Sequence, residues 1–504
     1  MASHNQLFSH LDRVLGPEKI ITRGQTLKAA MENTLGIDRD ICCIVLPDST
    51  RDVSRVVNAA NTFNIPIYPI SRGRNIGYGD RLPVTGGHIL MDLSHMNRVR
   101  NFDNALGTVT LEPGVTQAGL YEYLAAHESK FWMDVTGAGL DSSIVGNTLE
   151  GGFGHTPAGF RRGMLSDLEV VCGNGQILHT GDMIDAGPNL SGLFVQSNFG
   201  IVTALKTRLV RIPEHYKSFT IRVARDQDLE ALVDTLKTLR QNGTLTSLVH
   251  IANATRSLMS TQPLPPGFEN RPVSCEDAVA LTRKGVLRVG HWTAIGGLYG
   301  SAAEIQAKEK QVRNAVRGIG AFTSFSDRKI NRLKFIGRFS RTVKNSLDSL
   351  GYVHGLGMGI PNDSQVRHIH WRVKRPEHMG LKWVSPKMSA CGSHVRRMLD
   401  TASRIFRDRG LEFPVTITLV LPDQAIAVLN ITFDKSSPEQ TQQAGELYAE
   451  LHAAFENAGV NFYRLGITEM PDQQYRDQGK QHTLEMLKQV FDPNRIIAPG
   501  RYGL

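Results

Sequence analysis

Pro69-Ile70-Ser71-Arg72-Gly73-Arg74-Asn75-Ile76-Gly77-Tyr78-Gly79-Asp80 is the stretch that decides how this chain is interpreted. It follows an apolar run at residues 65–70, which predicts a short buried strand. The glycines allow positive φ values and let another group approach the backbone closely. Successive N–H groups in such a turn form a concave nest for anionic oxygens, and the two arginines add positive charge. The loop therefore suits a pyrophosphate, with an ordinary glycine-rich turn as the alternative.

A second glycine-rich segment, at residues 137–155, supports the same interpretation. Its glycines stand at positions 137, 139, 146, 151, 152 and 154. Because each glycine costs conformational entropy on folding, so many suggest that another backbone or a flat ligand passes close by. Neither segment is the nicotinamide fingerprint, since Gly152-Phe153-Gly154 lacks the third glycine and residues 355–359 have the wrong spacing. We therefore do not expect a doubly wound dinucleotide fold.

The composition is that of a globular protein with more than one domain. The chain has 504 residues, of which 41% are hydrophobic and 21% charged, and a formal net charge of +9. Its basic residues are scattered and not interleaved with aromatic ones, so we expect no nucleic-acid binding. Residues 1–6 lack a signal core and no apolar run is long enough to cross a bilayer, so we expect no membrane association. Five cysteines without a Cys-x-x-Cys pair favour a reducing compartment, and we expect a cytoplasmic protein.

The hydrophobic periodicity predicts a mixed α+β chain. Asp48-Ser49-Thr50 is a helix start, and valines at 53, 56 and 57 then recur at helical spacing. Turn chemistry at 173–175 predicts a hairpin between strands at 168–172 and 176–179. From about residue 213, helical stretches at 228–241 and 302–319 are followed by strands at 415–421 and 425–433. This grouping suggests a second α+β layer that covers the first.

The two glycine-rich segments and several others, in the same order, resemble the vanillyl-alcohol oxidase and p-cresol methylhydroxylase flavoproteins, which are FAD-linked and 4-cresol dehydrogenase-like. The further matches are Glu112-Pro113-Gly114-Val115-Thr116, the block from Gly146-Asn147 to Thr156-Pro157, residues 196–203, residues 295–300, Tyr463-Arg464 and residues 492–501. The resemblance spans residues 40–504. It implies a two-subdomain PCMH-type FAD-binding domain at 1–212, an α+β cap domain with the substrate pocket at 213–462, and a return to the FAD-binding domain at 463–504.

The resemblance implies FAD as the cofactor. It assigns FAD binding to the two glycine-rich segments, to a later strand and to an arginine near the C-terminus. These residues are Ser71, Arg72, Gly73, Arg74, Asn75, Ile76, Gly77, Gly137, Ser143, Gly146, Asn147, Glu150, Gly152, His155, Gly200, Ile201, Val202 and Arg501. A fixed cation at Arg501 could stabilise negative charge on reduced flavin, and a surface arginine on a tail is the alternative.

In this family three groups hold a substrate phenol, and the resemblance carries these roles to Tyr78, Tyr463 and Arg464. Two O–H donors and a guanidinium would hold the substrate oxygen as phenolate, because charge-assisted hydrogen bonds favour the anion. A para-alkyl phenolate can then release a hydride from its benzylic carbon to flavin N5 and become a quinone methide. The alternative is that Tyr78 only packs and that Arg464 pairs with a carboxylate.

The chain departs from the family at the positions that often bind flavin covalently. Counting back from Ser385-Pro386, the residue at the first such position is Leu381. The predicted phosphate loop, residues 71–80, offers no histidine at the second such position either, because Asn75 and Ile76 stand there. We therefore expect dissociable FAD, although His378 could provide a link if the alignment is shifted.

Other departures concern the chemistry near flavin N5. Oxidase-type relatives carry an acid there, and ungapped counting places Ala138 at that site, with Asp141 or Asp134 as substitutes if the loop is shifted. His155 stands where relatives carry a tyrosine, and it could act as a base, a hydrogen-bond donor or a neutral packing group.

The cap segment adds a few weaker candidates. His368 and His370 would share a face on a strand and could line the pocket. We expect no metal site, because no third ligand accompanies them. Glu377 is a weak candidate for a pocket carboxylate.

The expected function is FAD-dependent oxidation of a small aromatic substrate, such as a phenol substituted para to its hydroxyl. The acceptor would be O2 or an electron-carrier protein, and homodimerisation is a family-level expectation. Two alternatives stay open. One is oxidation of a non-phenolic alcohol in an altered pocket, and the other is a mainly structural flavin-binding subunit of an electron-transfer complex.

Overall fold

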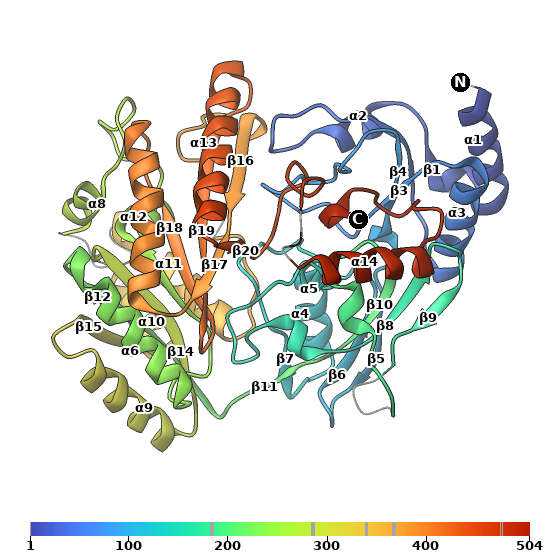
Figure 1. Ribbon diagram of the computed structural model, residues 1–504. Helices are drawn as coiled ribbons and strands as arrows, with labels where there is room; N and C mark the ends of the chain where they lie inside the picture. The colour runs from blue at the N-terminus through green and yellow to red at the C-terminus, as the bar shows by residue number, and fades with distance from the viewer. Residues whose placement is uncertain are drawn as a thin grey trace.

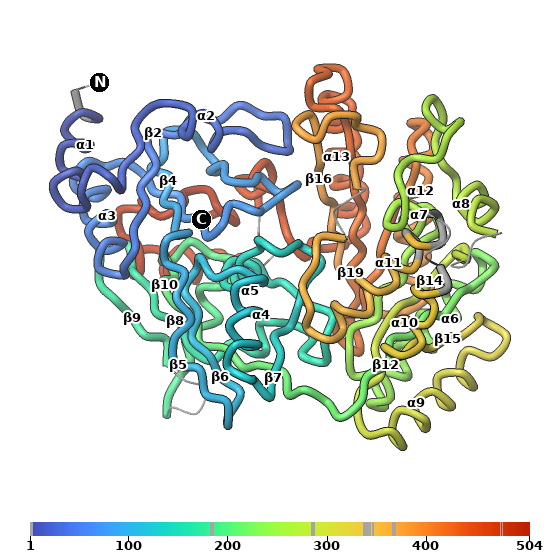
Figure 2. The backbone as a smooth tube through the Cα atoms, turned by 180° about the vertical axis from the view of Figure 1, so that it is seen from behind, coloured from blue at the N-terminus to red at the C-terminus, as the bar shows by residue number. Residues whose placement is uncertain are grey.

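The computed structural model describes residues 2–504 apart from 182–185, 284–287, 338–340, 365–368, 474 and 476. The molecule consists of two halves that lie side by side, each built on its own β-sheets (Figure 1). The chain passes from the first half to the second after β11 (Val210–Arg211), at the lower edge in both views (Figures 1 and 2). Both termini lie in the first half.

The first sheet carries the phosphate loop. Its strands follow the order β1 (Ile20–Ile21), β2 (Ile41–Val45), β4 (His88–Asp92) and β3 (Ile67–Ile70), with β2, β4 and β3 parallel. The helices α1 (Ala2–Leu15), α2 (Gln25–Met31) and α3 (Thr50–Phe63) accompany it. The predicted start of α3 is confirmed, because the Ser49 side chain accepts a hydrogen bond from the Asp52 amide.

The second sheet of this half is antiparallel. Its order is β5 (Val99–Asp103), β6 (Thr108–Leu111), β10 (Gly200–Arg208), β8 (Leu165–Cys172) and β9 (Ile177–His179). The predicted hairpin is confirmed as β8–β9. The connections include α4 (Gln117–Ala126), β7 (Phe131–Trp132) and α5 (Ile144–Leu149).

The other half is built on a nine-stranded sheet. Its strands are β12 (His215–Val223), β13 (Val249–Asn253), β14 (Trp292–Gly300), β15 (Ala321–Phe325), β16 (Met379–Val384), β17 (Pro386–Ser389), β18 (Val415–Leu421), β19 (Gln424–Asp434) and β20 (Asn461–Phe462). The helices are α6 (Leu229–Gln241), α7 (Ala254–Met259), α8 (Cys275–Thr282), α9 (Ala302–Ala315), α10 (Asp327–Gly337), α11 (Arg341–Gly357), α12 (Gly392–Asp408) and α13 (Pro438–Asn457). The helix predicted at 302–319 ends at Ala315, where a turn precedes β15.

The two faces of this sheet differ. The core face packs residues such as Val249, Ile417 and Leu429 against α6, α12 and α13. Because side chains alternate along a strand, His250 and Thr418 lie on the opposite face, where Val428 also lies. There His250 pairs its Nδ1 with the Thr418 hydroxyl at 3.0 Å. That face borders the first half.

The C-terminal segment returns to the first half. Its helix α14 (Gln478–Phe491) packs against the core of the antiparallel sheet. Ile67 exchanges backbone hydrogen bonds with Ile496 and Ala498, at 2.7 and 2.8 Å. The last residues of the chain therefore fix β3, from which the phosphate loop leaves.

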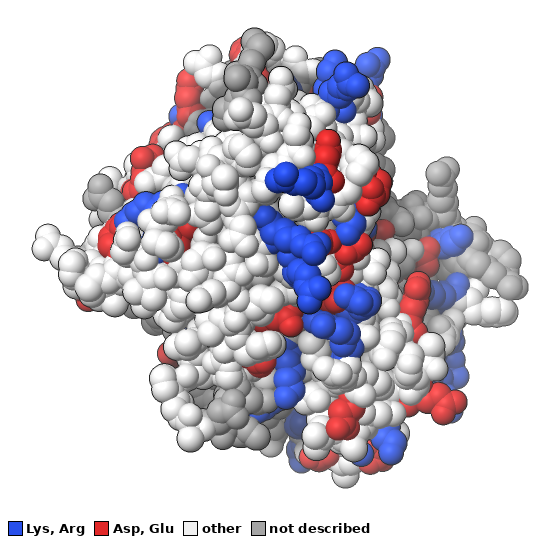
Figure 3. Space-filling model, turned by 90° about the vertical axis from the view of Figure 1, so that its right-hand side faces the viewer, with Lys and Arg blue, Asp and Glu red and all other residues white. Residues whose placement is uncertain are grey.

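Charge on the surface is mixed. On the face shown in Figure 3, lysine and arginine side chains form a band that acidic side chains interrupt. None of the helices in the described part of the chain is long and apolar enough to cross a membrane.

Candidate cofactor and substrate site

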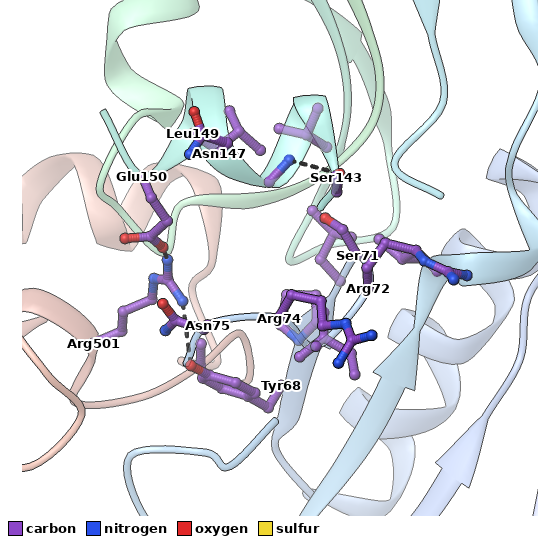
Figure 4. A pocket seen from close by; sticks show the side chains of 18 of the residues that line it. Tyr68, Ser71, Arg72, Arg74, Asn75, Ser143, Asn147, Leu149, Glu150 and Arg501 are labelled. Carbon is purple, nitrogen blue, oxygen red and sulfur yellow. Dashed lines mark hydrogen bonds and ion pairs between the residues drawn. The ribbon is translucent and has the colours of Figure 1, made fainter. Parts of the chain in front are cut away.

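An elongated cavity lies between the phosphate loop, α5, the start of β10 and the C-terminal residues (Figure 4). Its lining includes most of the predicted cofactor-binding residues. These are Ser71, Arg72, Gly73, Arg74, Asn75, Ser143, Gly146, Asn147, Glu150, Gly200, Ile201, Val202 and Arg501. Figure 4 shows Arg72 and Arg74 at one end and Glu150 with Arg501 at the other.

The arginine-rich end offers free backbone donors. In the described part of the chain, the amides of Arg72, Gly73 and Arg74 donate to no other group. Gly73 has φ of +61°, a conformation that favours glycine. Both arginines contact Asp141, with 3.0 Å between Arg74 Nε and the carboxylate, so part of their charge is compensated. Unpaired amides next to cations are the arrangement that a pyrophosphate requires.

Close packing explains some of the glycines. A Cβ at Gly146 would lie 2.9 Å from Ser71 Oγ, so this glycine lets α5 approach the phosphate loop. At Gly77, φ is +77° and a Cβ would overlap the ring of Trp383 on β16. At Gly152 a Cβ would overlap the Asn147 side chain. Protein atoms therefore account for the glycines at 77 and 152.

The opposite end of the cavity holds a buried carboxylate between two arginines. Arg501 forms an ion pair with Glu150, and Arg464 Nε lies 3.3 Å from the same carboxylate. The Tyr502 hydroxyl donates to Glu150 at 2.8 Å. Two guanidinium groups share one carboxylate, so this end keeps a net positive charge.

The three residues predicted to hold a phenol are neighbours, but only Arg464 lines this cavity, whereas Tyr463 lines the adjoining one. The Arg464 guanidinium lies 4.6 Å from the centroid of the Tyr78 ring, and its Nη2 donates to Asn75 at 2.5 Å. Tyr78 shares a 2.7 Å hydrogen bond with Ser385. Burial raises the pKa of Tyr78 although Arg464 and Ser385 oppose it, and burial likewise raises the pKa of Tyr463. Both hydroxyls therefore stay protonated and can donate.

His155 lies next to these groups, at the face of the nine-stranded sheet. Its ring centroid is 4.4 Å from that of His250, and Tyr463 packs against Phe153 nearby. Burial lowers the pKa of His155 to about 4, and the neighbouring Arg161 contributes to this shift. His155 is therefore neutral at physiological pH, and a neutral imidazole cannot fill a role that requires a positive charge.

Five predicted cofactor residues do not line the cavity. Ile76 packs with Leu381 and Trp383, and Gly137 and His155 also lie outside, as do Gly77 and Gly152. Sequence reasoning in turn missed Tyr68, Ser197, Asn198 and Ala498, which do line it, as does Ala138 from the predicted N5 site. Asn198 belongs to the matching stretch 196–203, so that motif held a signal for it.

The positions of the acidic residues correct one expectation. Asp141 is engaged by the arginines of the phosphate loop, and Asp134 is engaged by Thr156 and Arg161. Burial raises the pKa of Asp134, while Arg161 opposes that shift. Neither carboxylate borders the cavity, whereas Ala138 does. Asp141 and Asp134, the residues that could have replaced the acid expected near flavin N5, therefore bind other side chains instead.

The other candidates lie outside the cavity. Leu381 is 1% exposed and packs with Met259 and Ile369. His378 lies 3.7 Å from Asp434, an acid on β19. His370 is in a turn rather than a strand, and His368 lies outside the described residues. No cluster of three potential metal-ligating side chains occurs among the residues that the structure describes.

Comparisons with known proteins agree with this geometry. Residues 42–181 match the FAD binding domain family. The chain is 29% identical to the 1'-carboxy-chondrochloren decarboxylase of Chondromyces crocatus, over 97% of this chain and 95% of the relative. It is 28% identical to the 4-cresol dehydrogenase (hydroxylating) flavoprotein subunit of Pseudomonas putida, over 91% of this chain and 87% of the relative. It is also similar to the crystal structure of p-cresol methylhydroxylase with substrate bound, with a TM-score of 0.88, 25% identity, and coverage of 100% of this chain and 97% of that one.

These matches extend over nearly the whole chain and include an FAD-binding domain and a flavoprotein subunit. They confirm the predicted α+β fold class, the flavin cofactor and the enzymatic character of the protein. The chain is an FAD-dependent oxidoreductase that is similar, over nearly its whole length, to PCMH-type flavoproteins such as p-cresol methylhydroxylase.

Proposed function

We propose that this enzyme oxidises a small phenol at the benzylic carbon of the substituent para to its hydroxyl. The observation that carries the proposal is that Tyr78 and Tyr463 lie next to Arg464, which lines the positively charged end of the cofactor cavity. Relatives named for 4-cresol and p-cresol support the substrate class. FAD, when bound, supplies a two-electron acceptor for hydride.

The side chains of this enzyme hold the substrate as an anion. Two protonated tyrosines and one guanidinium stabilise a phenolate more than a phenol, because the charged oxygen accepts stronger hydrogen bonds. The phenolate then pushes electron density toward the benzylic carbon at its para position, so that loss of a hydride from that carbon leaves a neutral quinone methide. His155 is neutral and accepts or donates a hydrogen bond near that carbon.

We further propose that the FAD is dissociable and that the cavity end at Arg72 and Arg74 binds its pyrophosphate. The unpaired amides of the loop support this fit, and the Asn147 Oδ1, which has no partner in the described structure, offers an acceptor for a donor group elsewhere on the FAD. Leu381 cannot form a bond to the flavin. Acid precipitation should leave a yellow supernatant over a colourless pellet, and colour in the pellet would contradict the proposal.

Anaerobic addition of 4-ethylphenol tests the substrate class. The flavin absorbance should bleach with 4-ethylphenol and persist with 4-ethylanisole, whose methylated oxygen cannot become a phenolate. Equal bleaching by both compounds would favour a non-phenolic alcohol or ether site. Persistence with both would favour a mainly structural flavin subunit. Re-oxidation in air would then identify O2 as the acceptor, and slow re-oxidation would favour an electron-carrier protein.

A second candidate function is oxidative decarboxylation of a carboxylated phenol. Two observations favour it: the full-length similarity to a decarboxylase and the presence of Ala138 at the cavity instead of an acid. An acid there would repel a substrate carboxylate. Release of CO2 from 4-hydroxyphenyl-substituted acids during flavin bleaching would support this function, and bleaching without CO2 would exclude it.

A further inference from the structure

A second, larger cavity of about 1250 Å³ lies where α13, the C-terminal segment and the first half meet. Arg464 and Ser197 line both this cavity and the cofactor cavity. Tyr463, another of the residues proposed to hold the phenol, also lines the second cavity, so this cavity adjoins the proposed substrate-holding end. Its volume exceeds the usual size of about 300–1,000 Å³ for small-molecule sites.

Lys382 on β16 lines this cavity and is only 7% exposed. In the described part of the chain, its ammonium donates no hydrogen bond and forms no ion pair. Its Nζ lies 5.2 Å from the centroid of the Tyr448 ring, which is a cation–π contact. Burial lowers the pKa of Lys382, and only Glu469 opposes that shift. The side chain is buried, but its ammonium reaches the cavity without a protein acceptor, so an anion that enters the cavity would be its first direct partner.

The nearest carboxylate does not serve as that anion. Glu469 accepts hydrogen bonds from the Tyr448 hydroxyl at 2.7 Å and from Thr468. Burial raises the pKa of Glu469, while these two hydroxyls oppose the shift. Glu469 thus interacts with Lys382 only through the longer-range field.

The wall next to Lys382 is aromatic. His452 stacks on Phe462, with centroids 4.0 Å apart and planes 16° apart, and Tyr448 lies 4.4 Å from His452. Burial lowers the pKa of His452 to about 4, helped by the charge of Lys382. His452 is therefore uncharged at neutral pH and acts as a flat surface rather than a second cation.

We propose that this cavity binds a small aromatic carboxylate, with Lys382 as its cation and the Tyr448, His452 and Phe462 rings as its apolar wall. The carboxylate would supply the acceptor that the ammonium lacks. The ring would cover aromatic surface that is otherwise exposed to the cavity. Because Tyr463 and Arg464 also line this cavity, the site adjoins the proposed phenol site, and Lys382 is the residue that distinguishes the two.

Calorimetric titration of the FAD-loaded protein with benzoate tests the proposal, because benzoate has no phenolic hydroxyl. We expect saturable one-to-one binding that Lys382→Met weakens by about tenfold or more. Lys382→Arg should restore it. Lys387→Met is the matched control, because Lys387 lines the same cavity but is exposed, and it should leave the affinity unchanged.

Two further readouts separate ligand binding from a structural role. Binding should take up protons above neutral pH, because the carboxylate raises the pKa of Lys382, and titrations in buffers of different ionisation enthalpy measure this uptake. Lys382→Met should not lower the Tm, since removing an unpaired buried charge is neutral or stabilising. Absence of saturable binding, equal affinity in Lys382→Met, or binding without proton uptake would each overturn the proposal.

Discussion

The two ends of the cofactor cavity are built in different ways. The arginine-rich end comes from one contiguous loop, residues 71–75, together with the start of α5. The Glu150–Arg501–Arg464 end joins side chains from the residue after α5, from the C-terminal segment and from the region after β20, which are distant in the sequence. The first end depends on local backbone conformation, whereas the second depends on the docking of the two halves. Mutations should therefore separate cofactor binding from substrate chemistry.

The largest expected effect is at the second end. Arg464→Met removes the cation that stabilises the phenolate, so the rate of flavin reduction by 4-ethylphenol should fall about a thousandfold. Stopped-flow absorbance of the FAD-loaded variant measures this rate. Arg162→Met is the matched control, because Arg162 is an exposed arginine, and it should keep the wild-type rate. A loss of less than about tenfold in Arg464→Met would remove Arg464 from the proposed chemistry.

The next effect is at the first end. Gly77→Ala places a side chain at φ of +77° against the Trp383 ring, which costs about 1–2 kcal/mol from the backbone alone. The loop should shift, and the Kd for FAD should rise roughly tenfold or more while bound flavin still reacts with 4-ethylphenol. Gly87→Ala has a similar positive φ with open space around it, and it should leave the Kd unchanged. Unaltered FAD affinity in Gly77→Ala would show that this packing does not support the cofactor site.

A smaller effect concerns pH. Because the pKa of His155 is lowered to about 4, its protonation should not change the flavin reduction rate between about pH 5.5 and 8. Because the pKa of His155 is lower in the folded state than in the unfolded state, the unfolded state takes up a proton at this residue at a higher pH. His155 therefore lowers stability as the pH falls from about 6.5 toward 4, and His155→Gln should lose less Tm over that interval. A rate step near pH 6.5 that His155→Gln abolishes would contradict this.

The smallest effect is expected at Ser385, which links the two halves through Tyr78. Ser385→Ala removes one 2.7 Å hydrogen bond, worth about 1 kcal/mol, so the reduction rate should fall about fivefold or less. Ser389→Ala, at the exposed end of β17 four residues further along the chain, controls for loss of a nearby serine hydroxyl and should leave the reduction rate unchanged. A loss as large as that of Arg464→Met would mean that Ser385 itself contacts the substrate.

The same contrast explains what could be predicted from the sequence. The phosphate loop was predictable because its glycines and arginines are contiguous, so local backbone chemistry reveals them. The Glu150–Arg501 pair was predictable only residue by residue through the family resemblance, and its contact was not. The position of His250 opposite His155 depends on the strand register and on which sheet face meets the first half. Neither property can be read from local sequence patterns.

Packing contacts explain why some of the predicted cofactor residues lie outside the cavity. Gly77 and Gly152 carry the signature of a ligand-binding glycine, but their neighbours are Trp383 and Asn147. Asp141 has the composition of an active-site acid, but it pairs with arginines that are close only in the folded chain. A glycine or an acid in the sequence indicates a close approach or a charge, and only the fold determines its partner.

A crystal structure of the FAD-loaded protein with 4-ethylphenol tests the central claim most directly. The account predicts the FAD pyrophosphate on the amides of Arg72, Gly73 and Arg74. It also predicts the phenol oxygen within hydrogen-bonding distance of Tyr78, Tyr463 and Arg464. A pyrophosphate elsewhere, or a phenol oxygen that points away from all three side chains, would contradict it.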